Sequence, residues 1–297
     1  MSSTQIWFGI PGTKMQLCPA PLINSQVSNV GYVETIVFEN GGADVTRSAQ
    51  YRKQYQFQIS GLFDEVDGIG VYNKYASGFY GDGLIYFADP YTFETNMFSA
   101  GWASPGLIEQ GWENIYDTVP TFANTTANIY NQPPRTATWA VTSSANAVPT
   151  TNNGTQYIVI PPTYTLNIGV TGSATGTAVV RVVPINTDGT NATAVDLTLI
   201  GATSATRMNA TFAGSSYQAV KVYITRTSTS SSTISITSMM ARMVETGASL
   251  TLTGDHMPGD GHTGLSFADD ARVENYLYIN PPRKAMNTTL LEVGAWR

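Results

Sequence analysis

The chain has 297 residues, of which 42% are hydrophobic and only 12% are charged, and its net charge is −6. This length is enough for about two domains with cores of their own. The acidic balance, without a stripe of Lys and Arg, argues against a protein that binds nucleic acid through its phosphates. No apolar run approaches the roughly 18 residues that a membrane-spanning helix needs, which argues against membrane insertion.

Cys18 is the single cysteine, so the chain cannot form an internal disulfide. It lies in the apolar stretch 15–19, where a cysteine typically acts as a small buried hydrophobic side chain. The N-terminus lacks the basic start and apolar run of a signal peptide. We therefore expect a protein that is made in a cytoplasm and stays soluble or joins an assembly.

Two β-strands with a turn between them are predicted near the N-terminus. Residues 31–38 are typical of a strand and end at Asn40-Gly41-Gly42, a strong hairpin signal. Residues 51–59 alternate strictly between long apolar and polar side chains, which predicts a half-buried strand. The aromatic side chains on its apolar face are Tyr51, Tyr55 and Phe57.

Helix signals are weak along the whole chain. The best short candidate is 67–76, which Gly68 and Gly70 interrupt. Each glycine costs about 1 kcal/mol in a helix interior. Residues 78–90 instead predict a turn, a short strand and a stop at Pro90, because proline cannot continue a central β-ladder.

The middle of the chain, from about 118 to 248, is rich in Thr, Ser, Ala, Asn and Val and poor in charge. Short alternating segments recur in it, at 164–170, 195–199, 208–212, 220–224 and 234–237. Strands of this kind separated by turn signals indicate a β-sandwich or barrel. The tail from 249 has further strand signals but is too short to hold a core alone, so it should pack onto the first module.

The predicted fold class is therefore all-β. It consists of a split β-barrel or β-sandwich domain, formed by residues 1–100 plus 249–297, and an inserted jelly-roll-like β-sandwich at 101–248.

Motifs that could carry chemistry are few. Residues 259–264 match G-x-G-x-x-G, but a nucleotide site needs a following helix and a later acid, and this region predicts glycine turns. His256 and His262 lie beside Asp255 and Asp260, yet their spacing matches no established metal motif. No G-x-S-x-G elbow occurs. We predict no catalytic, cofactor-binding or metal-binding residues, and a protein that is not an enzyme.

Aromatic residues are the remaining candidates for binding, because a sugar ring can stack on an exposed aromatic side chain. The candidates for glycan contact in the middle module are Trp139, Tyr157, Tyr164, Tyr217 and Tyr223. The alternative is that most of them belong to the core. For Trp139, its position between two apolar neighbours favours burial.

The flanking residues resemble a known family. Tyr80–Gly83, Phe87–Pro90 and Asn96 resemble the N-terminal module of minor tail proteins from tailed phages of actinobacteria. Gly259–Phe267 and Leu291–Trp296 resemble the C-terminal pieces of the same proteins. The middle is similar to the galectin-like or carbohydrate-binding-module type of jelly-roll sandwich. In size and layout the chain looks most like the distal tail protein family.

That resemblance implies a structural role in the virion. Distal tail proteins form a ring, commonly a hexamer, that joins the tail tube to the tip and baseplate. The expected partners are copies of the chain, the tail tube, other tail-tip proteins and, for the sandwich, a host surface glycan. The expected location is the phage tail tip, after assembly in the host cytoplasm. Tyr51, Tyr55 and Phe57 are then candidates for the core or interface of the ring domain.

The sequence departs from the family in one respect, because the sandwich is inserted and the chain returns to the ring domain. The alternative function is a receptor-binding or adhesion protein whose sandwich binds host glycan and whose flanks anchor it.

Overall fold

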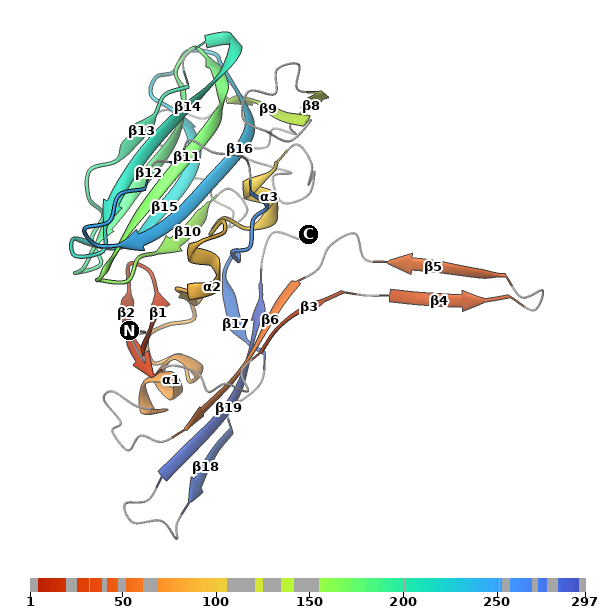
Figure 1. Ribbon diagram of the computed structural model, residues 1–297, viewed down its shortest axis with the longest axis vertical. Helices are drawn as coiled ribbons and strands as arrows, with labels where there is room; N and C mark the ends of the chain where they lie inside the picture. The colour runs from red at the N-terminus through yellow and green to blue at the C-terminus, as the bar shows by residue number, and fades with distance from the viewer. Residues whose placement is uncertain are drawn as a thin grey trace. The chain divides into compact units, whose positions relative to one another are not determined.

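The computed structural model shows an all-β chain of antiparallel sheets with short helices, which confirms the predicted fold class (Figure 1). The residues that the structure describes are 5–19, 26–31, 33–38, 42–47, 52–60, 69–105, 121–124, 135–141, 155–199, 201–250, 252, 257–268, 272–276 and 283–293. The chain forms two compact units. We call Met1–Gln5, Leu17–Leu84 and Leu265–Val293 the flank unit, and Ile6–Gln16, Ile85–Gly264 and Gly294–Arg297 the sandwich unit.

The sandwich unit contains a four-stranded and a five-stranded antiparallel sheet. The four-stranded sheet has the order β10 (Gln156–Val159), β15 (Tyr217–Arg226), β12 (Ala178–Asn186) and β13 (Val195–Leu197). The five-stranded sheet has the order β14 (Gly201–Ala213), β11 (Tyr164–Thr175), β16 (Ser232–Glu245), β9 (Arg135–Val141) and β8 (Thr121–Asn124).

The core of the sandwich follows from period-two alternation in these strands. On β11, Leu166, Ile168 and Val170 are fully buried, as the alternation predicts. On the four-stranded sheet, Val222 is likewise buried on the inner face. Trp139 stands opposite Ile234 across β9 and β16 and is 1% exposed, so it lies in the same core.

The sandwich unit also contains two short helices and most of a smaller sheet. The sheet has the order β2 (Lys14–Pro19), β1 (Gln5–Ile10) and β7 (Tyr86–Phe87), and its strands β1 and β2 each run into the flank unit at one end. The helices are α2 (Pro90–Phe93) and α3 (Ala100–Ala103). The short strand ends at Phe87, two residues earlier than the predicted stop next to Pro90, and Pro90 begins α2, where its missing N–H is harmless. Asp89 caps this helix by accepting a hydrogen bond from the Tyr91 N–H at 3.0 Å.

The flank unit is built on a sheet to which both ends of the chain contribute. The sheet has the order β17 (Leu265–Phe267), β19 (Arg283–Glu292), β6 (Arg52–Ser60) and β3 (Gln26–Val30), and β18 (Arg272–Tyr276) pairs with β19. The C-terminal strand β19 is antiparallel to β6, so the end of the chain returns to a sheet begun near its start (Figure 1). The flank unit also contains α1 (Ile69–Ala76) and the hairpin β4 (Val33–Val37) and β5 (Ala43–Arg47).

The alternation predicted for β6 is confirmed. Tyr55 and Phe57 are 1% and 5% exposed, so they belong to the core of the flank unit. Tyr51 lies outside the described residues. Cys18 is completely buried, as predicted, and burial raises the pKa of its thiol.

The helix α1 forms where the sequence offered a weak candidate. Ile69, Tyr72 and Tyr75 share one buried face at helical spacing. The Tyr72 hydroxyl donates a hydrogen bond to the carbonyl of Pro19. Tertiary burial of this face offsets the low helix propensity of Gly70.

The unit boundaries differ from the predicted domain boundaries. Residues 6–16, 85–100 and 249–264 belong to the sandwich unit, whereas the sequence placed them in the split domain. In the first segment, Trp7 Nε1 donates to the carbonyl of Gln218 on β15 at 2.9 Å. The other two segments form hydrogen bonds to the edge of β16 or to each other.

Candidate functional site

A buried asparagine joins three distant segments of the sandwich unit. Asn96 is completely buried, and its amide Nδ2 donates to the carbonyls of Met239 at 2.9 Å and Met257 at 3.0 Å. Its Oδ1 accepts from the N–H groups of Phe98 at 3.2 Å and Ala241 at 3.0 Å. Asn96 therefore satisfies the polar groups of β16 on the side where β9 no longer pairs with it.

Two glycines of the G-x-G-x-x-G motif, Gly259 and Gly261, lie at this same junction. The Asp260 N–H donates to the Asn96 carbonyl at 2.8 Å, and the Gly261 N–H donates to the Phe98 carbonyl at 3.0 Å. A Cβ atom on Gly261 would lie 1.8 Å from the carbonyl oxygen of Met97, and one on Gly259 would lie 2.5 Å from the carbonyl oxygen of Phe98. Close backbone approach thus explains both glycines.

His262 lies in a small aromatic pocket beside this junction. Its ring stacks on Phe87 with the centroids 5.4 Å apart, and its carbonyl accepts a hydrogen bond from Gln156 Nε2 at 2.8 Å. The Tyr86 hydroxyl donates to the neighbouring Thr263 carbonyl at 2.6 Å. Tyr157 also lines the hollow, whose volume of about 20 Å³ gives room for a single water molecule and none for a sugar ring.

Within the described residues, no group of three or more His, Cys, Asp and Glu side chains is arranged to hold a metal ion. Asp255 and His256 lie outside those residues. Nor does the described part of the chain contain a helix that is both long and apolar enough to cross a lipid bilayer.

The predicted glycan-contacting aromatics do not form one platform. Trp139 and Tyr223 are 1% and 3% exposed, so neither ring offers an open face to a sugar. Tyr164 packs on Phe93, with ring centroids 4.8 Å apart, and Tyr217 packs on Phe212 at 6.2 Å. Glycan contact by the half-buried Tyr157, Tyr164 and Tyr217 stays a prediction, while burial argues against Trp139 and Tyr223.

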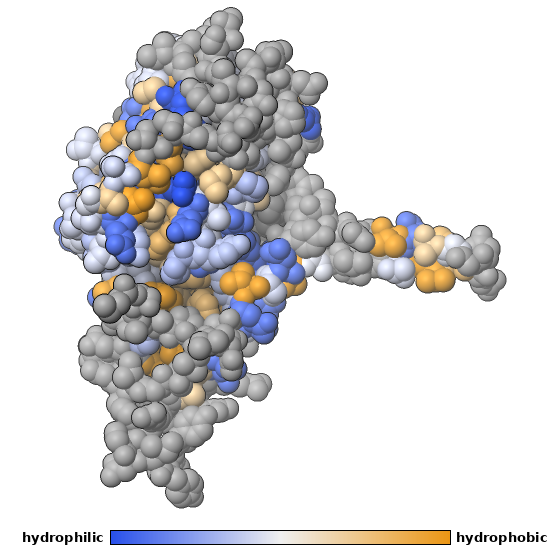
Figure 2. All heavy atoms as spheres, viewed as in Figure 1, coloured by the Kyte–Doolittle hydropathy of each residue, from blue (hydrophilic) through white to orange (hydrophobic). Residues whose placement is uncertain are grey.

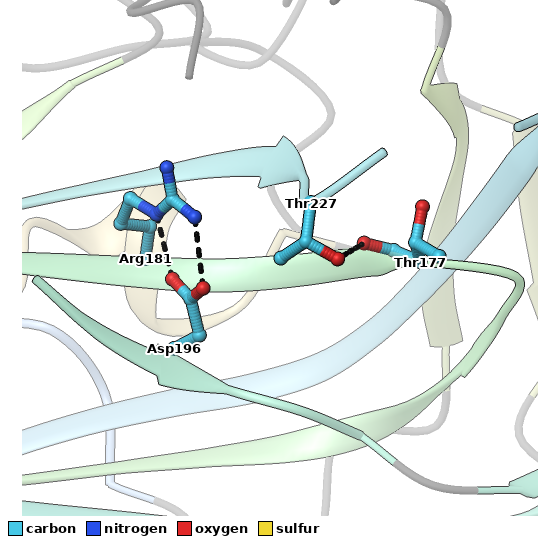
Figure 3. A network of polar contacts seen from close by, with 4 residues as sticks. All are labelled: Thr177, Arg181, Asp196 and Thr227. Carbon is cyan, nitrogen blue, oxygen red and sulfur yellow. Dashed lines mark hydrogen bonds and ion pairs between the residues drawn. The ribbon is translucent and has the colours of Figure 1, made fainter. Parts of the chain in front are cut away.

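The outer face of the four-stranded sheet is held by internal contacts. Arg181 on β12 and Asp196 on β13 are directly opposed and form a bidentate ion pair (Figure 3). Arg181 Nε lies 2.6 Å from Asp196 Oδ1, and Arg181 Nη2 lies 2.8 Å from Asp196 Oδ2. This hydrogen bonding raises the pKa of the Arg181 guanidinium. Tyr223 lies opposite Arg181 on β15, and the Lys221 ammonium lies 5.8 Å from its ring centroid. The charged groups on this face are therefore engaged in contacts with one another or with a neighbouring ring.

The outer face of the five-stranded sheet has a different character. Directly opposed residues of antiparallel strands point to the same side, so the register defines this face. In the middle of the sheet its outward residues are Asn167, Gly169 and Thr171 on β11, Arg207, Asn209 and Thr211 on β14, and Ser238, Met240 and Arg242 on β16. Among these positions the charged side chains are both arginines. We call these residues the arginine face.

None of the residues predicted from the sequence to bind a ligand lies on the arginine face. The available signal was that the outward positions of 165–175 and 207–213 are mostly Thr, Ser, Asn and Arg, with one Gly and one Ala and without an acid. The alignment of those positions into rows depends on the register between strands, which the sequence does not state.

The flank unit carries a second candidate surface, the β4–β5 hairpin, which we call the β arm. Val33 stands opposite Arg47 and Val37 opposite Ala43, and the Phe38 N–H donates to the Gly42 carbonyl at 2.7 Å near the tip. The large apolar side chains exposed on the arm are Ile36 (47%), Val37 (70%), Phe38 (51%) and Val45 (45%). Figure 2 shows these apolar patches alternating with polar ones along the arm.

No family model and no curated protein matches the chain. Among solved structures, it is similar to the enzymatically active domain of tailspike protein 4 from bacteriophage CBA120, with 16% identity over 53% of this chain and a TM-score of 0.31. The chain covers only 22% of that tailspike domain.

Two carbohydrate-binding modules are also similar. One is the CBM22-1 xylan-binding domain of Paenibacillus barcinonensis Xyn10C, with 9% identity over 44% of this chain and 83% of that one, and a TM-score of 0.31. The other is TmCBM61 in complex with β-1,4-galactotriose, with 8% identity over 50% of this chain and 98% of that one, and a TM-score of 0.31.

Proposed function

We propose that this protein is a structural component of the tail tip of a long-tailed phage, and that copies of it form a ring that joins the tail tube to the tip and baseplate. The observation that carries the proposal is the β arm, whose apolar side chains are exposed on an isolated two-stranded hairpin. The likeness of both chain ends to minor tail proteins of actinobacterial phages supports the same class.

In the described part of the chain, the β arm pairs with no third strand. A two-stranded hairpin alone is marginally stable in water and needs a further surface to pack against. Burying the apolar side chains contributes about 25 cal/mol for each Å² removed from water. A neighbouring copy supplies that surface in a ring, because head-to-tail contacts repeat until the rotation closes.

The first experiment is the solution mass of the intact chain, measured by light scattering over a concentration series. We expect a closed oligomer, with six copies as the first expectation. The double variant Val37→Ser with Phe38→Ser should shift the mass toward the monomer. The matched control is Tyr91→Ser, because Tyr91 is 74% exposed but lies outside the arm. A monomer at every concentration, or an oligomer that is indifferent to the arm variant, contradicts the proposal.

The second candidate function is binding of host surface glycan by the sandwich unit. The arginine face favours it, because hydroxyl and amide groups gather there on neighbouring strands. A repeated copy number would raise weak binding to useful avidity. A screen of the intact chain against immobilised glycans tests this candidate, and the absence of any retained glycan would argue against it.

A further inference from the structure

We propose that the arginine face binds an anionic glycan, a saccharide polymer that bears carboxylate or phosphate groups, with Arg242 and Arg207 as the cationic contacts. This inference rests on the glycan-binding candidate above and names its ligand class. It does not depend on ring formation.

The position and burial of Arg242 support the proposal first. It stands opposite Asn167, which in turn stands opposite Thr211, so the three side chains form a row across β16, β11 and β14. The Nε of Arg242 is buried and has no hydrogen-bond acceptor in the described part of the chain. Arginine keeps its charge in proteins, and leaving a charged donor unsatisfied is costly.

Two neutral donors on the same face are also buried without a hydrogen-bond acceptor among the described residues. Asn167 is 6% exposed; its Oδ1 accepts a hydrogen bond from the Thr211 hydroxyl at 3.1 Å, while its Nδ2 is buried without an acceptor among the described residues. The Thr171 hydroxyl, two rows further along the same face, is likewise buried and has no hydrogen-bond partner among the described residues. A guanidinium Nε and an amide Nδ2 that both lack acceptors among the described residues call for a ligand that brings acceptor oxygens, as carboxylates and phosphates do.

Gly169 shapes the centre of this face. A Cβ atom there would lie 2.8 Å from Asn209 Oδ1 and 3.2 Å from Arg207 Nε, so both side chains occupy the space above the glycine. Arg207 Nη2 lies 3.9 Å from the sulfur of Met240 on the other side. The glycine therefore brings the second guanidinium onto the row next to that of Arg242.

The charge pattern separates the possible ligands. The chain carries a net charge of −6, yet the described outward positions of β11, β14 and β16 include two arginines and no carboxylate. A duplex or single-stranded nucleic acid would need a longer basic stripe. Two cations surrounded by the exposed Asn209 and Thr211 instead suit a ligand with a few charges and many hydroxyl groups.

The test is calorimetric titration of the intact chain at low salt with three probes: trigalacturonate, a glycerol-phosphate trimer and neutral β-1,4-galactotriose. Comparing the titrations with trigalacturonate and the glycerol-phosphate trimer distinguishes carboxylate from phosphate as the anionic group. We expect at least one anionic probe to bind, galactotriose to bind at least tenfold more weakly, and added salt to weaken the anionic binding.

The variant Arg242→Gln should weaken the anionic binding about tenfold or more, because it removes a charge-assisted hydrogen bond. The matched control is Arg52→Gln, an equal charge change at an exposed position of the flank unit, which should leave binding unchanged. Thermal unfolding of both variants shows that the fold is retained. Should Arg242→Gln not fold, Asn209→Ala replaces it, since Asn209 is exposed and its loss should also weaken binding.

The outcomes separate the two levels of the proposal. Equal or tighter binding of galactotriose, lost on Asn209→Ala, would overturn the anionic ligand class while leaving glycan binding intact. No binding of any probe at millimolar concentration would overturn both. Anionic binding that responds equally to Arg242→Gln and Arg52→Gln would place the ligand elsewhere and overturn the assignment to the arginine face.

Discussion

At the scale of single residues, Asn96 is a completely buried side chain whose amide forms four hydrogen bonds. All four of its hydrogen bonds go to backbone groups, and they reach the distant segments that contain Met239, Ala241 and Met257. A buried amide with every donor and acceptor engaged fixes its surroundings, because any rearrangement leaves buried polar groups without partners.

Replacing Asn96 by alanine should therefore destabilise the sandwich unit strongly. The change leaves two backbone N–H groups and two carbonyls without their partner, and each unsatisfied buried group costs about 1–3 kcal/mol. We expect a loss of about 3 kcal/mol or more, measured as a lower urea midpoint. Asn191→Ala, at an exposed position, should change the free energy of unfolding by less than about 0.5 kcal/mol. Similar midpoints for the two variants would contradict this role for Asn96.

Trp139 gives a second prediction at this scale. Its ring fills the core of the sandwich next to Ile234, so Trp139→Ala should cost about 3–5 kcal/mol of stability. Any loss of glycan retention in this variant should follow the fraction of unfolded protein, as seen by near-ultraviolet circular dichroism. A variant that stays fully folded but loses retention would show instead that the tryptophan contacts the ligand.

At the scale of elements, the ion pair between β12 and β13 is asymmetric in its burial. The Arg181 side chain is 10% exposed and that of Asp196 is 28% exposed. Removing the acid leaves a nearly buried guanidinium without its counter-charge, whereas removing the arginine leaves a carboxylate that water still reaches.

We therefore expect Asp196→Asn to destabilise the sandwich more than Arg181→Met does. The first change should cost about 3 kcal/mol, because breaking a buried pair by removing one partner is strongly unfavourable. Urea unfolding of both single variants and of the double variant measures the difference and the coupling energy. Equal costs for the two single variants would mean that water already reaches both partners.

Elements also show what the sequence could and could not predict. The strands β6 and β11 were predictable, because their alternation is local and records which face is buried. The meeting of Asn96 with Gly261, and the row formed by Arg242, Asn167 and Thr211, were not predictable. Both depend on the pairing of segments far apart in the chain, and alternation within one strand carries no information on register between strands.

At the scale of the whole molecule, the sandwich unit begins and ends outside the region with the distinctive Thr- and Ser-rich composition. The segments 85–105 and 257–264 have the composition of the flanks, yet they belong to the sandwich unit. Composition therefore marked the strands of the insert but not the junction that holds its edge.

This predicts a difference between two fragments of the chain. A fragment of residues 85–264 retains the hydrogen bonds of Asn96 and Gly261 to each other's segments and to β16, whereas a fragment of 101–248 loses them all. We expect the shorter fragment to unfold at a lower temperature or to aggregate through the exposed edge of β16. Equal melting temperatures would show that the junction adds nothing to the sandwich.

The same junction bears on how such a chain could be remodelled. The long segment of the sandwich unit that runs from Ile85 to Gly264 is closed near its two ends, since Asp260 and Gly261 donate directly to the part that contains Asn96 and Phe98. An insert whose ends are held this close behaves as a cassette, because closing the gap around it adds little loop entropy. A different sandwich with equally close ends could take its place and present a different surface, while β6 and β19 of the flank unit kept their own pairing.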